Sequence, residues 1–164
     1  TIEAADVDED GALVIGIVTS TDVDNNATAS YTVPTGLNAT AGFTINATTG
    51  EYSFDPSDAA YQYLADGEEL TVTTTVTVTD DQGATDTVDV VVNMTGTNDA
   101  PVITTVVNGT IEENFADAST IASLSATDVD SDDTPTYSIF SVDGNETGTV
   151  YDYFEIDSQT VQFH

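Results

Sequence analysis

The 164 residues of the chain include no cysteine, no lysine, no arginine and a single histidine, His164. Without cysteine there are no disulfides, thiolate nucleophiles or zinc–sulfur sites. Without lysine or arginine there is no basic groove for nucleic acid and no patch for an anionic membrane. No apolar run is long enough for a membrane-spanning helix, so we expect no membrane insertion. A lone imidazole at the end of the sequence also argues against a Ser-His or Cys-His catalytic apparatus.

Acidic residues, in contrast, are abundant. Thirty Asp and Glu residues give a formal net charge of −30 at pH 7. Apolar residues make up 39% of the sequence and alternate regularly with polar ones, so we predict a folded chain. Because no basic residue balances these carboxylates, they repel one another. The sequence therefore predicts a protein that works with divalent cations or high salt around it.

The apolar residues recur with a period of two, which is typical of strands. In the segment 70–79 they occupy positions 70, 72, 76 and 78, and every odd position is threonine. A turn at 80–83 leads to a return strand at 88–94, which predicts a hairpin. Further short strands are predicted at 13–17, 31–33, 43–45 and 52–54, with a turn at 48–50 and a helical candidate at 57–65. This pattern predicts an all-β chain that folds as an antiparallel Greek-key β-sandwich.

The sequence contains an internal repeat. Residues 21–24 (Thr-Asp-Val-Asp) recur at 127–130, and the Phe-x-Ile pattern at 43–45 recurs at 154–156. We therefore predict a first domain at 1–97, a linker at 98–101 and a partial second domain at 102–164. The second copy lacks an equivalent of the 72–94 hairpin. We expect a window cut from a longer repeat array, and the alternative is completion of the half-domain by a neighbouring chain through strand addition.

Three acidic clusters could bind a cation. They lie at 6–11, 22–26 and 128–133, and each contains Asp-x-Asp, which aims two carboxylates at one point. Calcium takes six to eight hard oxygen ligands of this kind. The first cluster begins like an EF-hand loop, but its twelfth position is Ile17 instead of glutamate, so an EF-hand is not expected. The other two clusters occupy the same place in the repeat, which favours calcium over a chance pattern.

Several motifs in order resemble a known family. They are Thr21–Asp24, Gly50–Phe54, Tyr63–Glu68, Val76–Asp80 and the closing segment Gly96–Pro101. Together they resemble the VCBS repeat, a bacterial cadherin-like module of very large secreted adhesins, often of the RTX type. Residues 102–164 resemble the first half of a further cadherin-like repeat, with Glu112-Glu113-Asn114 at its start. The resemblance implies a cadherin/immunoglobulin-like sandwich in tandem repeats on an extracellular or bacterial cell-surface protein.

The resemblance also implies a calcium site at the junction between repeats. The metal ligands that it predicts are Glu9 and Glu68 from the first domain, Asn98 and Asp99 from the linker, Asp128 and Asp130 from the second domain, and Asp22 and Asp24 for a preceding junction. Asp66 is a further candidate, and Glu113 would serve a following junction. One departure is Gly96, because the cadherin linker begins with aspartate. One ion of the usual cluster is therefore expected to be weak or missing.

We accordingly predict no enzyme but a calcium-stiffened segment of an adhesin that mediates cell-surface or cell–cell attachment. Its expected partners are neighbouring repeats of the same chain. Two alternatives stay open at this point. One is a module that binds a surface glycan or a protein receptor. The other is a subunit of a self-assembling extracellular fibre or surface layer, completed through its partial C-terminal domain.

Overall fold

The computed structural model describes residues 1–24, 27–109, 119–138, 141–142, 145–146, 154–157 and 160–163. Its internal contacts divide the chain into two compact units, unit 1 (Thr1–Asn98) and unit 2 (Asp99–His164). The prediction of an all-β fold is confirmed. In the described ranges the single helical element is the one-turn 3₁₀ helix η1 (Gly36–Asn38), and no helix there is long and apolar enough to cross a membrane.

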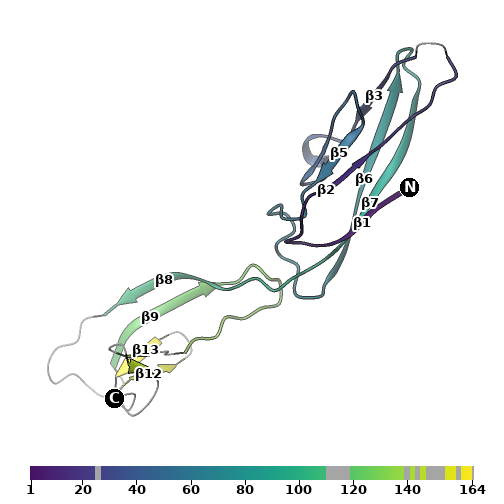
Figure 1. Ribbon diagram of the computed structural model, residues 1–164. Helices are drawn as coiled ribbons and strands as arrows, with labels where there is room; N and C mark the ends of the chain where they lie inside the picture. The colour runs from purple at the N-terminus through teal and green to yellow at the C-terminus, as the bar shows by residue number, and fades with distance from the viewer. Residues whose placement is uncertain are drawn as a thin grey trace. The chain divides into compact units, whose positions relative to one another are not determined.

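Unit 1 consists of two sheets (Figure 1). One has the strand order β1-β7-β6-β3 and the other the order β2-β5-β4. The strands are β1 (Ile2–Asp8), β2 (Val14–Ile17), β3 (Ala29–Thr32), β4 (Phe43–Ile45), β5 (Glu51–Phe54), β6 (Glu69–Asp80) and β7 (Thr85–Thr95). All neighbouring strands are antiparallel except β1, which runs parallel to β7. Among the described strands of unit 1, this parallel pair departs from the antiparallel sheet that the sequence predicts.

The long hairpin of β6 and β7 forms the centre of the first sheet (Figure 1). Its inward residues follow the predicted alternation, because Val76, Val90 and Met94 are each 1% exposed. They pack against residues of the second sheet, including Phe54, which is fully buried. Burial of each such side chain contributes about 1.5–3 kcal/mol. The core of unit 1 therefore lies between the two sheets, as in a sandwich.

Strand β2 is formed where the sequence predicts it, but with an unexpected inward face. Leu13, Ile15 and Ile17 are more than half exposed, and the residues that enter the core are Val14 and Val18. Between these two, the missing side chain of Gly16 leaves room for the ring of Tyr52, which a β-carbon at this position would overlap. The middle inward position of β2 is thus a glycine, because Tyr52 of the neighbouring strand β5 fills the space there.

The predicted helix at 57–65 is wrong. This segment forms successive turns in which the amides of Asp58, Tyr61 and Leu64 each donate to a carbonyl three residues earlier. The turns place Tyr61 and Leu64, which are 7% and 1% exposed, in the core beside Phe54. Packing of these two side chains decides the local conformation, because three-residue spacing brings both to the same side.

In unit 2 the described strands form a sheet with the order β12-β13-β9-β8 and a small β10–β11 pair. The strands are β8 (Val102–Asn108), β9 (Ser119–Thr127), β10 (Ser141–Val142), β11 (Asn145–Glu146), β12 (Phe154–Asp157) and β13 (Thr160–Phe163). Phe154 pairs with Phe163 just as Phe43 pairs with Phe54 in unit 1. Strands β9, β13 and β12 are therefore the structural equivalents of β2, β5 and β4.

Candidate metal centre

The loop that follows β9 gathers three carboxylates. Asp128 Oδ1 accepts a hydrogen bond from the N–H of Asp130 (3.2 Å), and the N–H of Asp133 donates to the Asp130 carbonyl (3.3 Å). These two local bonds fold the loop back on itself. One carboxylate oxygen from each of Asp128, Asp130 and Asp133 then lies within 4.8 Å of the others. The Asp-x-Asp motif predicted the first two of these residues, and the turn adds the third.

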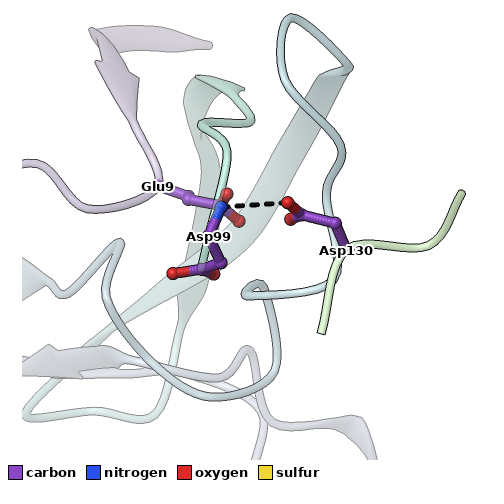
Figure 2. A group of neighbouring side chains, drawn as sticks. All are labelled: Glu9, Asp99 and Asp130. Carbon is purple, nitrogen blue, oxygen red and sulfur yellow. Dashed lines mark hydrogen bonds between the residues drawn. The ribbon is translucent and has the colours of Figure 1, made fainter. Parts of the chain in front are cut away.

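Asp130 is the buried member of this group. Its side chain is 5% exposed, and its Oδ2 accepts a hydrogen bond from the N–H of Asp99 (2.9 Å; Figure 2). Its other oxygen, Oδ1, is buried and has no hydrogen-bond partner within the described part of the chain. Burying an ionised carboxylate is costly unless a cation or hydrogen bonds compensate it. Lysine and arginine are absent from the sequence, so neither can compensate it.

The donor set fits a hard cation. Asp128 is half-buried, Asp130 is buried and Asp133 is exposed, so the group is reachable from solvent on one side. All three residues offer oxygen, which calcium prefers, whereas zinc favours thiolate and imidazole ligands. Calcium takes six to eight oxygens, and backbone carbonyls or water commonly supply those that carboxylates do not. The residues present are therefore compatible with the predicted calcium.

In unit 1 the predicted ligand Glu9 lies at the end of β1. It is fully buried, and its backbone N–H donates to the carbonyl of Thr95 (3.0 Å). Its Oε1 accepts a hydrogen bond from the N–H of Thr97 (2.9 Å). Because β1 runs parallel to β7, these bonds hold the carboxylate where β7 leads into the linker. The structure thus fixes Glu9 against the last residues of unit 1.

Glu68, also predicted as a ligand, is placed differently. It is exposed, and its Oε2 accepts a hydrogen bond from the N–H of Ala65 within its own loop (3.2 Å). The amide of Gly96 donates to the Glu68 carbonyl (2.8 Å), so the backbone of this loop, not its carboxylate, is bound to the residues just before the linker. Asp66 is exposed on the same loop. Neither residue joins a group of three acidic side chains in the described ranges.

The remaining predicted ligands are spread over the chain. Asp22 and Asp24 are exposed: Asp22 Oδ1 accepts from the Asp24 N–H (2.8 Å), and Asp24 Oδ2 accepts from Gln82 Nε2 (3.3 Å). In the linker, Asn98 is exposed and Asp99 is half-buried. Glu113 lies outside the described residues.

Sequence reasoning left Asp133 out of the ligand set. Its signal was present, because two further aspartates follow the Asp-x-Asp motif at 128–130. The residue that meets the motif in space is the one whose amide closes a turn onto Asp130. Asp132, its neighbour, is exposed and is not part of the group of three. This pair of adjacent aspartates therefore offers a matched comparison for experiments.

Comparison with solved structures identifies the fold. The chain is similar to human protocadherin-24 EC1-2 in its crystal form II, with 25% sequence identity, coverage of 98% of this chain and 73% of that one, and a TM-score of 0.55. The fold is cadherin-like. The chain is also similar to PcdhgB3 EC1-4, with 19% identity, coverage of 99% and 38%, and a TM-score of 0.52. No protein-family model matches the sequence, and no curated protein matches it.

Proposed function

We propose that this cadherin-like chain is a calcium-binding segment of an extracellular adhesion protein. The observation that carries the proposal is the buried oxygen of Asp130, which has no hydrogen-bond partner among the described residues and lies within 4.8 Å of two further carboxylate oxygens. A bound calcium ion would supply the positive charge that the sequence itself lacks. Asp128, Asp130 and Asp133 would hold it. The role is binding and mechanical, not catalytic.

We further propose that residues on both sides of the linker share this ion. Glu9 is bound to the amide of Thr97, and Asp130 is bound to the amide of Asp99. Only Asn98 separates these two amides in the sequence. Consecutive Cα atoms are 3.8 Å apart, so Thr97 and Asp99 stay within about 8 Å of each other however the units turn. Glu9, Asn98 and Asp99 are therefore within reach of an ion that Asp130 binds.

This connection gives calcium a mechanical effect. Without the ion, carboxylates on both sides of a short linker repel one another, and the linker can flex. With the ion their charge is compensated, and both ends of the linker are held at one point. Sites in extracellular modules have dissociation constants on the order of 10⁻⁴–10⁻³ M. A site of this affinity would be occupied where calcium is abundant, as in the extracellular location that we propose.

The finer proposal is that the chain belongs to a repeat array of a bacterial adhesin of the VCBS or RTX type and contributes to attachment between cells or to surfaces. The internal repeat, the Asp-x-Asp motif in both copies and the net charge of −30 support it. The large excess of one charge would also keep a long array soluble. Neighbouring repeats would be its nearest partners.

Isothermal titration calorimetry with calcium chloride in a sodium-containing buffer tests the metal site. We expect saturable binding by the wild-type chain, a loss of affinity of at least tenfold in Asp130→Asn, and little change in the neighbouring control Asp132→Asn. Loss of affinity in Glu9→Gln as well would support the junction site. Equal affinities in Asp130→Asn and Asp132→Asn, or heat that matched sodium additions reproduce, would overturn the proposal, because the carboxylates would then act only as a screened surface.

A further inference from the structure

Most asparagines of the chain belong to one short sequence pattern. Six of the nine have threonine two residues later with no proline between, at positions 26, 38, 46, 93, 108 and 145. Threonine makes up fewer than one residue in five of the chain, so this proportion exceeds what composition alone predicts. Asn-x-Thr is the acceptor sequence for glycosylation of an asparagine side chain. The acceptor sequences at 46–48 and 93–95 have both their asparagine and their threonine side chain among the described residues.

The turn between β4 and β5 presents Asn46 at the surface. Asn46 and Thr48 are both exposed. The side-chain oxygen Oδ1 of Asn46 accepts two backbone hydrogen bonds, from the N–H of Thr48 (2.9 Å) and from the N–H of Thr49 (3.1 Å). Its carboxamide nitrogen Nδ2 has no hydrogen-bond partner in the part of the chain that the structure describes. The nitrogen that would carry a sugar is therefore accessible, while the oxygen beside it is held in place.

Backbone hydrogen bonds fix the shape of this turn in the folded protein. The N–H of Gly50 donates to the Asn46 carbonyl (2.9 Å), which closes the turn. The Ala47 carbonyl accepts from the N–H of Tyr31 (2.9 Å), which binds the turn to β3. None of these bonds uses the side chain of Thr48, whose hydroxyl has no partner in the described ranges. Folding thus leaves both side chains of the acceptor sequence exposed and without other contacts to break.

Asn93 shows the opposite arrangement of the same acceptor sequence. It lies within β7 and is paired on both sides, with Asp6 of β1 and with Thr71 of β6. Its Nδ2 donates to Asp6 Oδ1 (2.9 Å), and its Oδ1 accepts from Thr71 Oγ1 (3.2 Å). A sugar on this nitrogen would have to enter the space between Asn93 and Asp6. Contacts of the sheet therefore occupy the side chain that a transferase would need.

We infer that Asn46 is the acceptor of an N-linked glycan attached to the folded protein, and that Asn93 is not an acceptor. The donor would be a sugar activated at C1 by a phosphate ester. In the reaction, Nδ2 of Asn46 forms a bond to C1, the bond from C1 to the phosphate oxygen breaks, and the phosphate leaves with that electron pair. One Nδ2 proton passes to a base of the transferase.

The hydrogen bonds at Oδ1 favour this reaction. As Nδ2 loses its proton, negative charge develops on the carboxamide oxygen, and the N–H groups of Thr48 and Thr49 stabilise it. The turn therefore does more than expose Asn46, because it also makes the nitrogen easier to deprotonate. The inference is independent of the calcium site, because no proposed metal ligand belongs to the turn at 46–50.

Peptide mapping of the protein isolated from the cells that produce it tests the inference. Chymotrypsin cleaves after aromatic residues, so cuts after Phe43 and Tyr52 release Asn46 without any other acceptor sequence. We expect mass spectrometry to find a glycan on this peptide and none on Asn93. Unmodified Asn46, or equal occupancy of Asn46 and Asn93, would overturn the inference. The mass of the adduct distinguishes the donors, because a nucleotide sugar transfers a single hexose and a lipid-linked donor transfers a preassembled oligosaccharide.

A reaction with purified components separates the effect of folding from that of sequence. The full chain, produced without glycosylation, is incubated with UDP-glucose and an asparagine N-glucosyltransferase that modifies synthetic peptides of residues 42–50 and 89–97. We expect the ratio of Asn46 to Asn93 modification to be at least tenfold higher in the folded chain than in the two peptides. Equal ratios in chain and peptides would overturn the inference, because the turn would then give Asn46 no advantage.

Two neighbouring threonines provide a matched pair of variants for the same reaction. Thr48→Ala removes the hydroxyl of the acceptor sequence and should abolish modification of Asn46. Thr49→Ala removes an equally exposed threonine outside the acceptor sequence and keeps the backbone N–H that Asn46 Oδ1 binds, so it should leave the yield almost unchanged. Equal yields from the two variants would contradict the assignment of residues 46–48 as the acceptor.

Discussion

Replacing Asp130 by asparagine should stabilise the calcium-free protein and remove most of the stabilisation that calcium gives. In EDTA the buried carboxylate lies within 4.8 Å of two others. At 4.8 Å a like-charge pair is destabilised by about 0.9 kcal/mol at the dielectric constant of water and by about 3.5 kcal/mol at an effective value of 20. Asparagine keeps an oxygen for the Asp99 N–H but removes the charge. We therefore expect Asp130→Asn to stabilise the calcium-free protein by roughly 1–3 kcal/mol.

Calcium should remove much or all of this difference between the two proteins. At about 10 mM calcium, a site with a dissociation constant of 10⁻⁴–10⁻³ M stabilises the folded state by about 1.4–2.7 kcal/mol. For a domain of about 60–100 residues, the size of either unit, that raises the melting temperature by roughly 6–20 °C. Asp130→Asn should lose most of this increment, because it removes the buried member of the ligand group.

Thermal unfolding followed by circular dichroism measures both effects in one series of samples. Asp132→Asn is the control, because it removes the same charge from the same loop but from outside the group of three. It should change stability by less than about 0.5 kcal/mol in both conditions, as exposed substitutions usually do. If Asp130→Asn lowers the melting temperature equally in EDTA and in calcium, the reasoning is refuted, and the carboxylate serves only as an acceptor for the backbone.

Three further predictions concern the fold. Gly50→Ala should destabilise the protein by more than about 1 kcal/mol in urea, since Gly50 has φ of 72° and a β-carbon there would overlap the backbone carbonyl oxygen of Val18. Leu64→Ala should cost about 2–5 kcal/mol, because the side chain is 1% exposed. Burial raises the pKa of Tyr52 and of Tyr61, so their hydroxyl groups lose a proton at lower pH in the unfolded state than in the folded state. Deprotonation then favours unfolding, and the urea midpoint should fall as the pH rises above about 10.

Matched controls separate these effects from unspecific ones. Gly36 has a similar φ of 67° but open space around it, so Gly36→Ala should cost less than Gly50→Ala. Leu37 is fully exposed, and Leu37→Ala should leave the urea midpoint almost unchanged. Equal losses within either pair would contradict the packing described for unit 1. A urea midpoint that stays constant between pH 8 and 11 would contradict the pH prediction.

The strands and turns with strong local signals could be predicted from the sequence. Residues 70–79 allow only one inward face, because every odd position is threonine. Leu13, Val14 and Ile15 allow either face, and the choice is made by the Tyr52 ring over Gly16, a contact distant in sequence. The parallel pairing of β1 with β7 joins the two ends of unit 1 and has no local signal either.

The candidate site also depends on contacts between residues distant in sequence, which no local motif predicts. The repeated Asp-x-Asp motif identified Asp128 and Asp130 because their spacing alone places two carboxylates together. Which of the two aspartates at 132 and 133 joins them depends on a turn that no motif specifies. The burial of Asp130 and its bond to the Asp99 amide depend on packing around residues 31 positions apart. Only the structure could therefore single out the buried oxygen.

The central claim, that calcium holds the two units at their junction, is tested most directly by a distance distribution. Spin labels at Thr73→Cys and Thr120→Cys, both exposed strand residues of different units, can be measured by double electron–electron resonance in EDTA and in calcium. The account predicts a broad distribution in EDTA that narrows in calcium, and no narrowing when Asp130→Asn is added. The account would be contradicted if the doubly labelled protein without Asp130→Asn gave a distance distribution of the same width in EDTA and in calcium.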